Sequence, residues 1–275
     1  MPTATEIPFY QVDAFTDRPF AGNPAGVCLL DSPLPSHLMQ AVGAEMNLSE
    51  TAFVQPPDAD GIRLLRWFTP TVEVPLCGHA TLATAHILLR ESGAEPPLRF
   101  STLSGILEVE AEEGEWLRMD FPADPPAPAP PPEGLLEALG CDSTSPTLVA
   151  TKGWIVRLAT ETGVRRVTPD YNRLGRVNLG PTALGVMVTA PGAGEVAFVS
   201  RFFGPWVGVD EDPVTGMAHT MLGPYWAGEK DTQELVARQV SARGGTLRMR
   251  LMGERVHISG QAVTVVRGEL SVPVG

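Results

Sequence analysis

Hydrophobic and polar residues alternate in short runs along most of the chain, a pattern typical of short strands separated by turns. The first run extends from Ile7 to Leu30 and is interrupted by the turn-forming sequence DRPFAGNPAG. Further strands are predicted at residues 51–55, 62–68, 98–101, 105–111, 116–121, 154–158, 185–190 and 196–203, and four more towards the C-terminus. The pattern therefore predicts a protein built mainly from short strands.

Three segments have helical periodicity instead. The first follows Pro35, where apolar residues recur at three- and four-residue spacing, at Leu38, Met39, Val42 and Met46. Residues 78–90 and 216–226 are apolar most of the way round, and a helix of that kind is usually buried. Each half of the chain thus contains one apolar helix among short strands.

A proline-rich segment divides the two halves. Seven of the residues from Pro122 to Pro132 are proline, which disfavours a continuous helix or strand and indicates a linker. We predict an N-terminal domain of residues 1–122 and a C-terminal domain of residues 123–275, and leave open whether the last strand returns to the first domain. An alternating βαβ arrangement ranks second, because helices are few and no GxGxxG or GxxxxGK[ST] phosphate loop is present.

Composition and charge narrow the possible partners. The net charge of −12 repels nucleic acids and anionic membranes, and no apolar window approaches the roughly 18 residues needed to span a bilayer. The N-terminus has no targeting signal, so we expect a soluble, cytoplasmic protein. Cysteines at positions 28, 77 and 141 form no CxxC pair, which disfavours a disulfide framework or a thiolate zinc site.

Candidate chemistry gathers where the two apolar helices begin, in CGHATLATAH and DPVTGMAHTM. Backbone N–H groups in the first turn of a helix are unpaired and carry partial positive charge, so both starts suit a carboxylate. His79 is a ligand-binding donor, a general acid or an ordinary histidine at a helix start. Asp212 and Thr215 have an equally simple alternative as helix N-caps.

Glu50 lies in NLSETAF, before a predicted strand. It is either exposed by strand alternation or buried with a raised pKa, and only the second state suits a proton carrier near pH 7. The five histidines show no HxxxH or HExxH spacing, so we expect no metal site.

Several segments together resemble the PhzF-like (phenazine biosynthesis) family: NLSETAFV, VPLCGHATLATA, SRFFGPWVGVDEDPVTGMAH, QVSARGGTLRMR and GQAVTV, in that order. The resemblance covers nearly the whole chain. It implies an α+β fold of two similar domains, each a curved antiparallel sheet or barrel wrapped round a central helix, related to diaminopimelate epimerase. It also implies a homodimer.

The resemblance further implies an isomerase that needs no cofactor and moves a proton on a small acidic substrate held between the domains. Glu50 would be the general acid/base, with Asp212 and His79 as its catalytic partners. Substrate-binding groups would be Ser49, Gly78, Gly216 and Met217. Members of the family usually have serine at the position of Met217, so this chain lacks a hydroxyl donor there and a less polar substrate becomes as plausible as the phenazine-pathway substrate.

Two alternatives stay open at this stage. Cys77 stands where related two-thiol racemases and epimerases carry one catalytic cysteine, but DEDPVTG supplies no second thiol. A binding protein that kept the fold and lost catalysis is the other alternative, and it is motivated by Met217.

Overall fold

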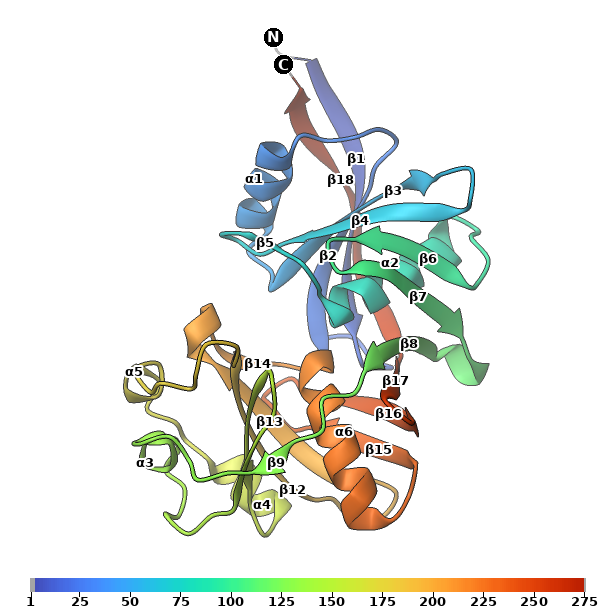
Figure 1. The fold of residues 1–275 in the computed structure, drawn as a ribbon. Coiled ribbons are helices and arrows are strands. Elements are labelled where there is room, and N and C mark those ends of the chain that lie inside the picture. The colour runs from blue at the N-terminus through green and yellow to red at the C-terminus, as the bar shows by residue number, and fades with distance from the viewer. Residues whose placement is uncertain (1–2, 275) are drawn as a thin grey trace. The chain divides into compact units, whose positions relative to one another are not determined.

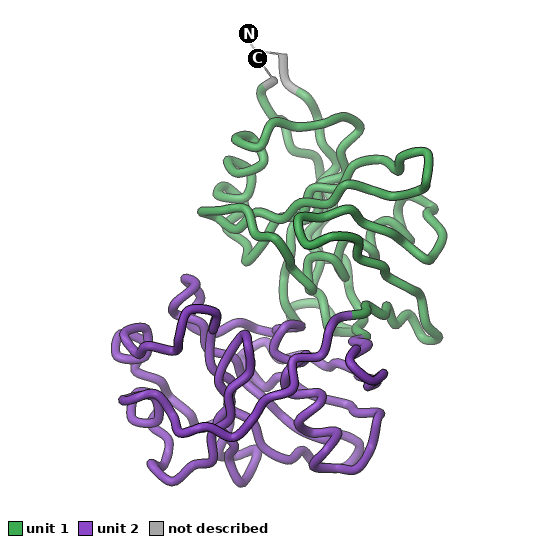
Figure 2. Tube along the Cα trace, in the orientation of Figure 1, with its two compact units in different colours: residues 1–120, 259–275 green, residues 121–258 purple. Residues whose placement is uncertain are grey.

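The computed structural model describes residues 3–274, which divide into two compact units (Figures 1 and 2). Unit 1 contains Met1–Asp120 and Ser259–Gly275, and unit 2 contains Phe121–Ile258. The end of the chain belongs to the first unit because the last strand, β18 (Ala262–Val274), pairs antiparallel with almost the full length of β1 (Thr3–Ala14).

The sheet of unit 1 continues from β1 through antiparallel and parallel pairs. Antiparallel pairs join β1 to β2, β3 to β4, β4 to β5, β6 to β7 and β7 to β8. Parallel pairs join β2 to β3 and β4 to β6. The strands are β2 (Asn23–Leu29), β3 (Glu50–Pro57), β4 (Ile62–Phe68), β5 (Glu73–Val74), β6 (Leu98–Thr102), β7 (Gly105–Ala111) and β8 (Leu117–Pro122), and a 3₁₀ turn, η1 (Glu113–Glu115), precedes β8.

Two helices pack on the strands of unit 1. The apolar helix α2 (Gly78–Glu91) is buried over most of its length and contacts β1, β2, β3 and β18. The amphipathic helix α1 (Ser36–Met46) places its predicted apolar face in a separate cluster with Phe53 and Phe68, whose rings meet edge to face at 5.6 Å. Both helices therefore form where the sequence periodicity predicts them.

Unit 2 also contains one long apolar helix among strands. This helix, α6 (Gly216–Lys230), contacts β15 and β16. Antiparallel pairs join β9 to β10, β10 to β11, β12 to β13, β13 to β14 and β15 to β16, and parallel pairs join β11 to β12 and β13 to β15. The strands are β9 (Ala127–Pro128), β10 (Thr147–Val149), β11 (Gly153–Arg157), β12 (Gly185–Pro191), β13 (Phe198–Gly204), β14 (Val209–Asp212), β15 (Glu234–Gln239), β16 (Gly245–Met252) and β17 (Arg255–Gly260).

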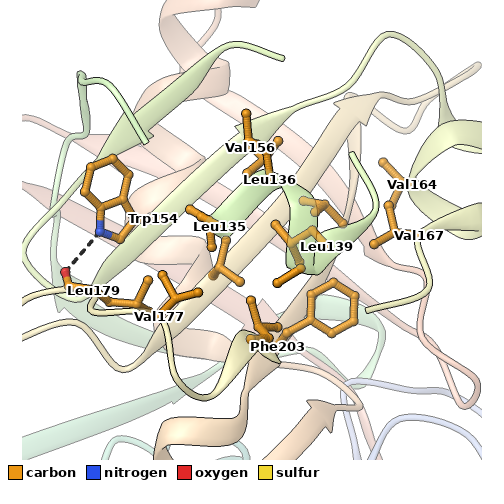
Figure 3. Close-up of a cluster of buried hydrophobic side chains, with 14 of the residues drawn as sticks. Leu135, Leu136, Leu139, Trp154, Val156, Val164, Val167, Val177, Leu179 and Phe203 are labelled. Carbon is orange, nitrogen blue, oxygen red and sulfur yellow. Dashed lines mark hydrogen bonds between the residues drawn. The ribbon is translucent and has the colours of Figure 1, made fainter. Parts of the chain in front are cut away.

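A second layer in unit 2 consists of short helices that the periodicity did not predict: α3 (Leu135–Leu139), α4 (Glu161–Arg166), α5 (Tyr171–Leu174) and the 3₁₀ turn η2 (Pro205–Val207). Leucines of α3 pack with Val156 and Phe203, and the Trp154 indole donates a hydrogen bond to Leu179 O at 3.1 Å (Figure 3). Helices this short are stabilised mainly by such packing and by caps, here the side chains of Thr160 and Asp170.

The predicted α+β class is confirmed, with one correction to the predicted linker. Ala127–Pro128 pairs with β10 as the short strand β9, although we expected this proline-rich segment to form no sheet. The pairing is possible because Ala129, between two prolines, supplies the N–H that donates to Thr147 O. Within residues 3–274, no helix is long and apolar enough to cross a membrane.

Candidate active site

The start of α2 is the first of two candidate sites. Cys77 is extended (φ −144°, ψ 107°), and the helix begins at the next residue, Gly78. The side chain of Thr81 donates to Cys77 O at 2.6 Å, which helps to hold the turn. No side chain of the described chain caps α2, so the backbone N–H groups of its first turn are available to an anionic ligand group.

Glu50 faces this helix start from the first position of β3. The parallel pairing of β2 and β3 sets Glu50 opposite Ala25, and its Oε2 lies 3.2 Å from Nε2 of His79, the second residue of α2. Only 19% of the Glu50 side chain and 8% of the His79 side chain are exposed. The separation is that of a hydrogen bond, but the two groups are not aligned as one, as is common before a ligand completes a catalytic site.

Burial decides the charge of His79. Removal of the ring from water lowers the pKa of His79 to about 3, so the imidazole is neutral near pH 7. The contact with Glu50 is therefore between a carboxyl group and a neutral ring, and only one of the two ring nitrogens carries a hydrogen.

The opposite edge of the ring meets two further side chains. His79 Nδ1 lies 3.3 Å from Asn23 Nδ2 and 3.5 Å from Cys77 Sγ. Asn23 is fully buried at the start of β2, and Ser49 Oγ lies 3.5 Å from its Oδ1. The structure thus brings Ser49, Glu50, Cys77 and His79 together in unit 1, beside the helix start at Gly78, and adds Asn23.

Sequence reasoning missed Asn23, although a signal was present. The residue lies in DRPFAGNPAG, which was interpreted only as a turn. Burial of an asparagine next to an apolar strand costs free energy unless its amide is hydrogen-bonded. An asparagine in this position therefore indicates a buried polar network.

His79 and two of its neighbours, Glu50 and Cys77, are also residue types that bind metal ions. In the part of the chain that the structure describes, ligand atoms of Glu50, Cys77 and His79 lie within 4.8 Å of one another. However, Glu50 is on the Nε2 side of the imidazole and Cys77 is on the Nδ1 side, and the two lone-pair directions diverge. One ion would therefore bind only one of the two ring nitrogens of His79, and the absence of a metal stays a prediction.

The other two cysteines, Cys28 and Cys141, lie outside this cluster of Glu50, Cys77 and His79. Burial raises the pKa of Cys28 far above its ordinary value and raises the pKa of Cys141 to about 11. Both thiols are therefore protonated near neutral pH, which disfavours either as a catalytic thiolate.

The start of α6 is the candidate site of unit 2. Thr215 is extended (φ −116°, ψ 101°), Gly216 begins the helix, and Met217 is its second residue. Asp212, at the end of β14, accepts a short hydrogen bond from the Thr215 hydroxyl. The structure thus brings Asp212, Gly216 and Met217 to one helix start, and Thr215 directs its hydroxyl to Asp212 rather than capping the helix.

Gln239 holds this helix start from β15, and sequence reasoning did not single it out. Its Nε2 donates to Asp212 O at 2.7 Å and to Thr215 Oγ1 at 3.2 Å, and its Oε1 accepts from Thr215 N at 2.9 Å. Ser241 adds a hydrogen bond to Pro213 O at 2.7 Å. Both residues lie in QVSARGG, whose polar residues therefore fix the backbone of the DPVTG turn.

Comparisons with known proteins agree with this arrangement. The family model described as phenazine biosynthesis-like protein (PhzC-PhzF) matches residues 12–268. An uncharacterized isomerase of Pseudomonas aeruginosa is 50% identical over 266 residues, which cover 96% of this chain and 99% of the relative.

Solved structures agree on the fold. The crystal structure of a PhzF-family phenazine biosynthesis protein of Enterococcus faecalis has a TM-score of 0.90 and 40% identity, and the match covers 97% of this chain and 99% of that one. A hydroxyproline epimerase of Agrobacterium vitis is only 11% identical, with a TM-score of 0.63 over 100% of this chain and 95% of that chain, and shares the fold alone. The resemblance inferred from the motifs is confirmed, and so is the assignment to the isomerases.

Proposed function

The chain belongs to the phenazine biosynthesis-like (PhzC-PhzF) family, and from that premise we propose that it moves a proton between two carbons of a small carboxylate-containing substrate, with Glu50 as the general acid/base and no cofactor. The observation that carries the proposal is the approach of Glu50 Oε2 to within 3.2 Å of His79 Nε2 beside an uncapped helix start.

The geometry supplies each requirement of such a reaction. A carbon next to a carbonyl, or conjugated with one, loses a proton when the resulting anion is stabilised. Backbone N–H groups at Gly78 and His79 are fixed donors for that anion, and they need no reorganisation during the reaction. Glu50 takes the proton from one carbon, and the carboxylic acid formed returns a proton to the other carbon.

Substrate binding is proposed for the remaining residues of both helix starts. Ser49 and Gly78 would contact the substrate in unit 1, and Asp212, Gly216 and Met217 in unit 2. Asp212 would accept a hydrogen bond from an amino or hydroxyl group, and Gly216 would offer its backbone N–H to a carboxylate. That the substrate binds between the two domains stays a prediction, as does the homodimer.

Hydrogen exchange at carbon tests the proposal. The protein is incubated in D₂O with a panel of small amino, hydroxy and unsaturated acids, and deuterium on carbon is followed by NMR. Glu50→Gln should lower exchange by about 10²- to 10⁴-fold, because the variant lacks the base. Glu45→Gln, the same change on the exposed face of α1, is the matched control and should retain full activity.

Exchange that survives in Glu50→Gln would refute the role of Glu50. Absence of exchange in every variant, together with retained ligand binding, would favour the alternative of a non-catalytic binding protein. The homodimer is tested separately by light scattering, where a single 29.3 kDa species would exclude it.

A second candidate mechanism uses Cys77 as one of two bases. It is favoured by the 3.5 Å separation of Cys77 Sγ from His79 Nδ1 and by the position of the thiol at a helix N-terminus. The equivalent position in unit 2 is Thr215, a poor base, so a two-thiol mechanism is not available. Retention of activity in Cys77→Ser would exclude this mechanism, and a loss comparable to that in Glu50→Gln would support it.

A further inference from the structure

The position of one hydrogen on His79 decides what this residue offers to Glu50. The ring is neutral, so either Nε2 or Nδ1 carries the hydrogen. With the hydrogen on Nε2, this edge of the ring offers a donor to a ligand atom and, after a small rotation of either side chain, to the Glu50 carboxylate. With the hydrogen on Nδ1, Nε2 would be an acceptor 3.2 Å from a carboxylate oxygen that is also an acceptor, and this side of the ring would offer no donor.

The surroundings of Nδ1 favour the first tautomer. The amide nitrogen of Asn23, which is a donor only, lies 3.3 Å from Nδ1. The amide oxygen is turned the other way, towards the Ser49 hydroxyl at 3.5 Å. The amide orientation shown thus pairs donor with acceptor at both ends, and Asn23, fully buried at the start of β2, has no solvent in which to satisfy the reverse arrangement.

We propose that Asn23 is a positioning residue that fixes His79 as the Nε2–H tautomer, by donating from its Nδ2 to His79 Nδ1. The tautomer assignment is independent of the reaction, whereas its catalytic consequence rests on the proposed function. An Nε2–H 3.2 Å from Glu50 Oε2 donates to the reacting carboxyl group once a bound ligand aligns the two side chains. It also provides a side-chain donor next to the backbone donors of the α2 start.

Cys77 is the other group near Nδ1, and it is a weaker candidate for this role. Its Sγ is farther away, at 3.5 Å, and a thiol is a poor hydrogen-bond donor. The two residues make different predictions: removal of the thiol should leave the tautomer unchanged, whereas reversal of the polarity at position 23 should change it.

NMR of protein labelled with ¹⁵N at histidine tests the assignment without any substrate. In the wild type, His79 Nε2 should give a protonated, pyrrole-like signal and Nδ1 an unprotonated, pyridine-like signal, with the resonances assigned by their loss in His79→Gln. Asn23→Asp keeps the shape of the side chain but replaces the donor by an acceptor, so Nδ1 should become protonated. Cys77→Ala is the matched control and should keep the wild-type signals.

Activity measurements test the consequence separately. Asn23→Asp should lower kcat roughly 10²-fold with a smaller change in KM, because the donor is lost from the reacting end of the site. A wild-type protein with a pyridine-like Nε2 would overturn the proposal, and so would an unchanged tautomer in Asn23→Asp. The wild-type spectrum decides even if that variant does not fold. If Nε2–H is found but no substrate exchanges, the proposed function fails while the tautomer assignment stands.

Discussion

The starts of α2 and α6 use the same backbone arrangement with different side chains. In each, an extended residue, Cys77 or Thr215, precedes a glycine that begins the helix. In each, the side chain four residues later donates to the carbonyl of that extended residue: Thr81 at 2.6 Å in α2, and His219 at 2.8 Å in α6. Neither helix receives a side-chain cap from the described residues.

The second residue of each helix marks the main difference. It is His79 in α2, which faces Glu50, and Met217 in α6, which offers no proton. The acid of unit 2, Asp212, accepts from the Thr215 hydroxyl and is held through its carbonyl by Gln239. The same backbone arrangement therefore carries different side chains at the two helix starts. We propose that the start of α2 serves proton transfer and that the start of α6 serves substrate binding.

The largest predicted effect on stability concerns the two histidines next to these helix starts, His79 and His219. Burial lowers the pKa of His79 to about 3 and that of His219 to about 4, from an ordinary value of 6.5. Both are neutral in the folded protein, whereas the unfolded chain binds protons below pH 6.5, so acid favours unfolding. Between pH 7 and pH 5 we expect a loss of about 2 kcal/mol per histidine, measured by urea denaturation.

His219→Gln separates the two contributions. Glutamine keeps an amide donor for Thr215 O but does not titrate, so the variant should lose about 2 kcal/mol of the pH dependence between pH 7 and pH 5. An unchanged slope would show that His219 is accessible to protons in the folded protein and that the two helix starts differ in burial.

A somewhat smaller effect is expected at Gln239. Gln239→Leu removes three hydrogen bonds and leaves the buried Thr215 N–H without its acceptor, so the free energy of unfolding should fall by about 3 kcal/mol. Gln40→Leu is the control, since Gln40 donates one hydrogen bond, to Thr69 O in unit 1, and should cost about 1 kcal/mol. Equal effects would contradict a special role for Gln239 in the α6 start.

Met217→Ser tests the binding task of unit 2 directly. A hydroxyl at this position should strengthen binding of hydroxy or amino acids by about 2- to 10-fold, the worth of one hydrogen bond, as measured by calorimetry. Met217→Ala removes the same bulk without adding a donor, so it should not reproduce the gain. If alanine and serine act alike, the size of Met217 determines selectivity, and its lack of a hydroxyl does not.

The sequence predicted the elements whose patterns are long and periodic. The helices at Gly78 and Gly216 begin where the Gly-containing turns indicated, and residues 62–68 and 105–111 form strands with the predicted bounds. The short helices α3 to α5 were missed because four to six residues carry too little periodicity, although the caps Thr160 and Asp170 were visible in the sequence. Parallel pairs such as β2 with β3 depend on tertiary contacts that no local pattern encodes.

In the candidate site, only the residues that lie in recognisable motifs were predicted from the sequence. Glu50 and His79 were named from motifs that lie almost thirty residues apart, and the structure places them 3.2 Å apart. Asn23 and Gln239 were missed because the role of a buried amide depends on the groups that its oxygen and its nitrogen contact. Those groups come from other segments of the chain. Asn23 connects Ser49 with His79, and these three residues come from separate segments.

Metal removal is expected to leave the exchange activity unchanged, which is the smallest effect predicted here. The same experiment also compares the two helix starts. At α6, Asp212 accepts from Thr215 and the Nδ1 of His219 bonds to the backbone, whereas at α2 three possible ligand atoms lie within 4.8 Å of one another. If His79 carries its hydrogen on Nε2, that nitrogen has no lone pair for an ion beside Glu50. Dialysis against a chelator should therefore leave carbon exchange unchanged. A loss that zinc restores, and that Cys77→Ala abolishes, would instead show that α2 holds a metal and that the paired helix starts differ in that respect as well.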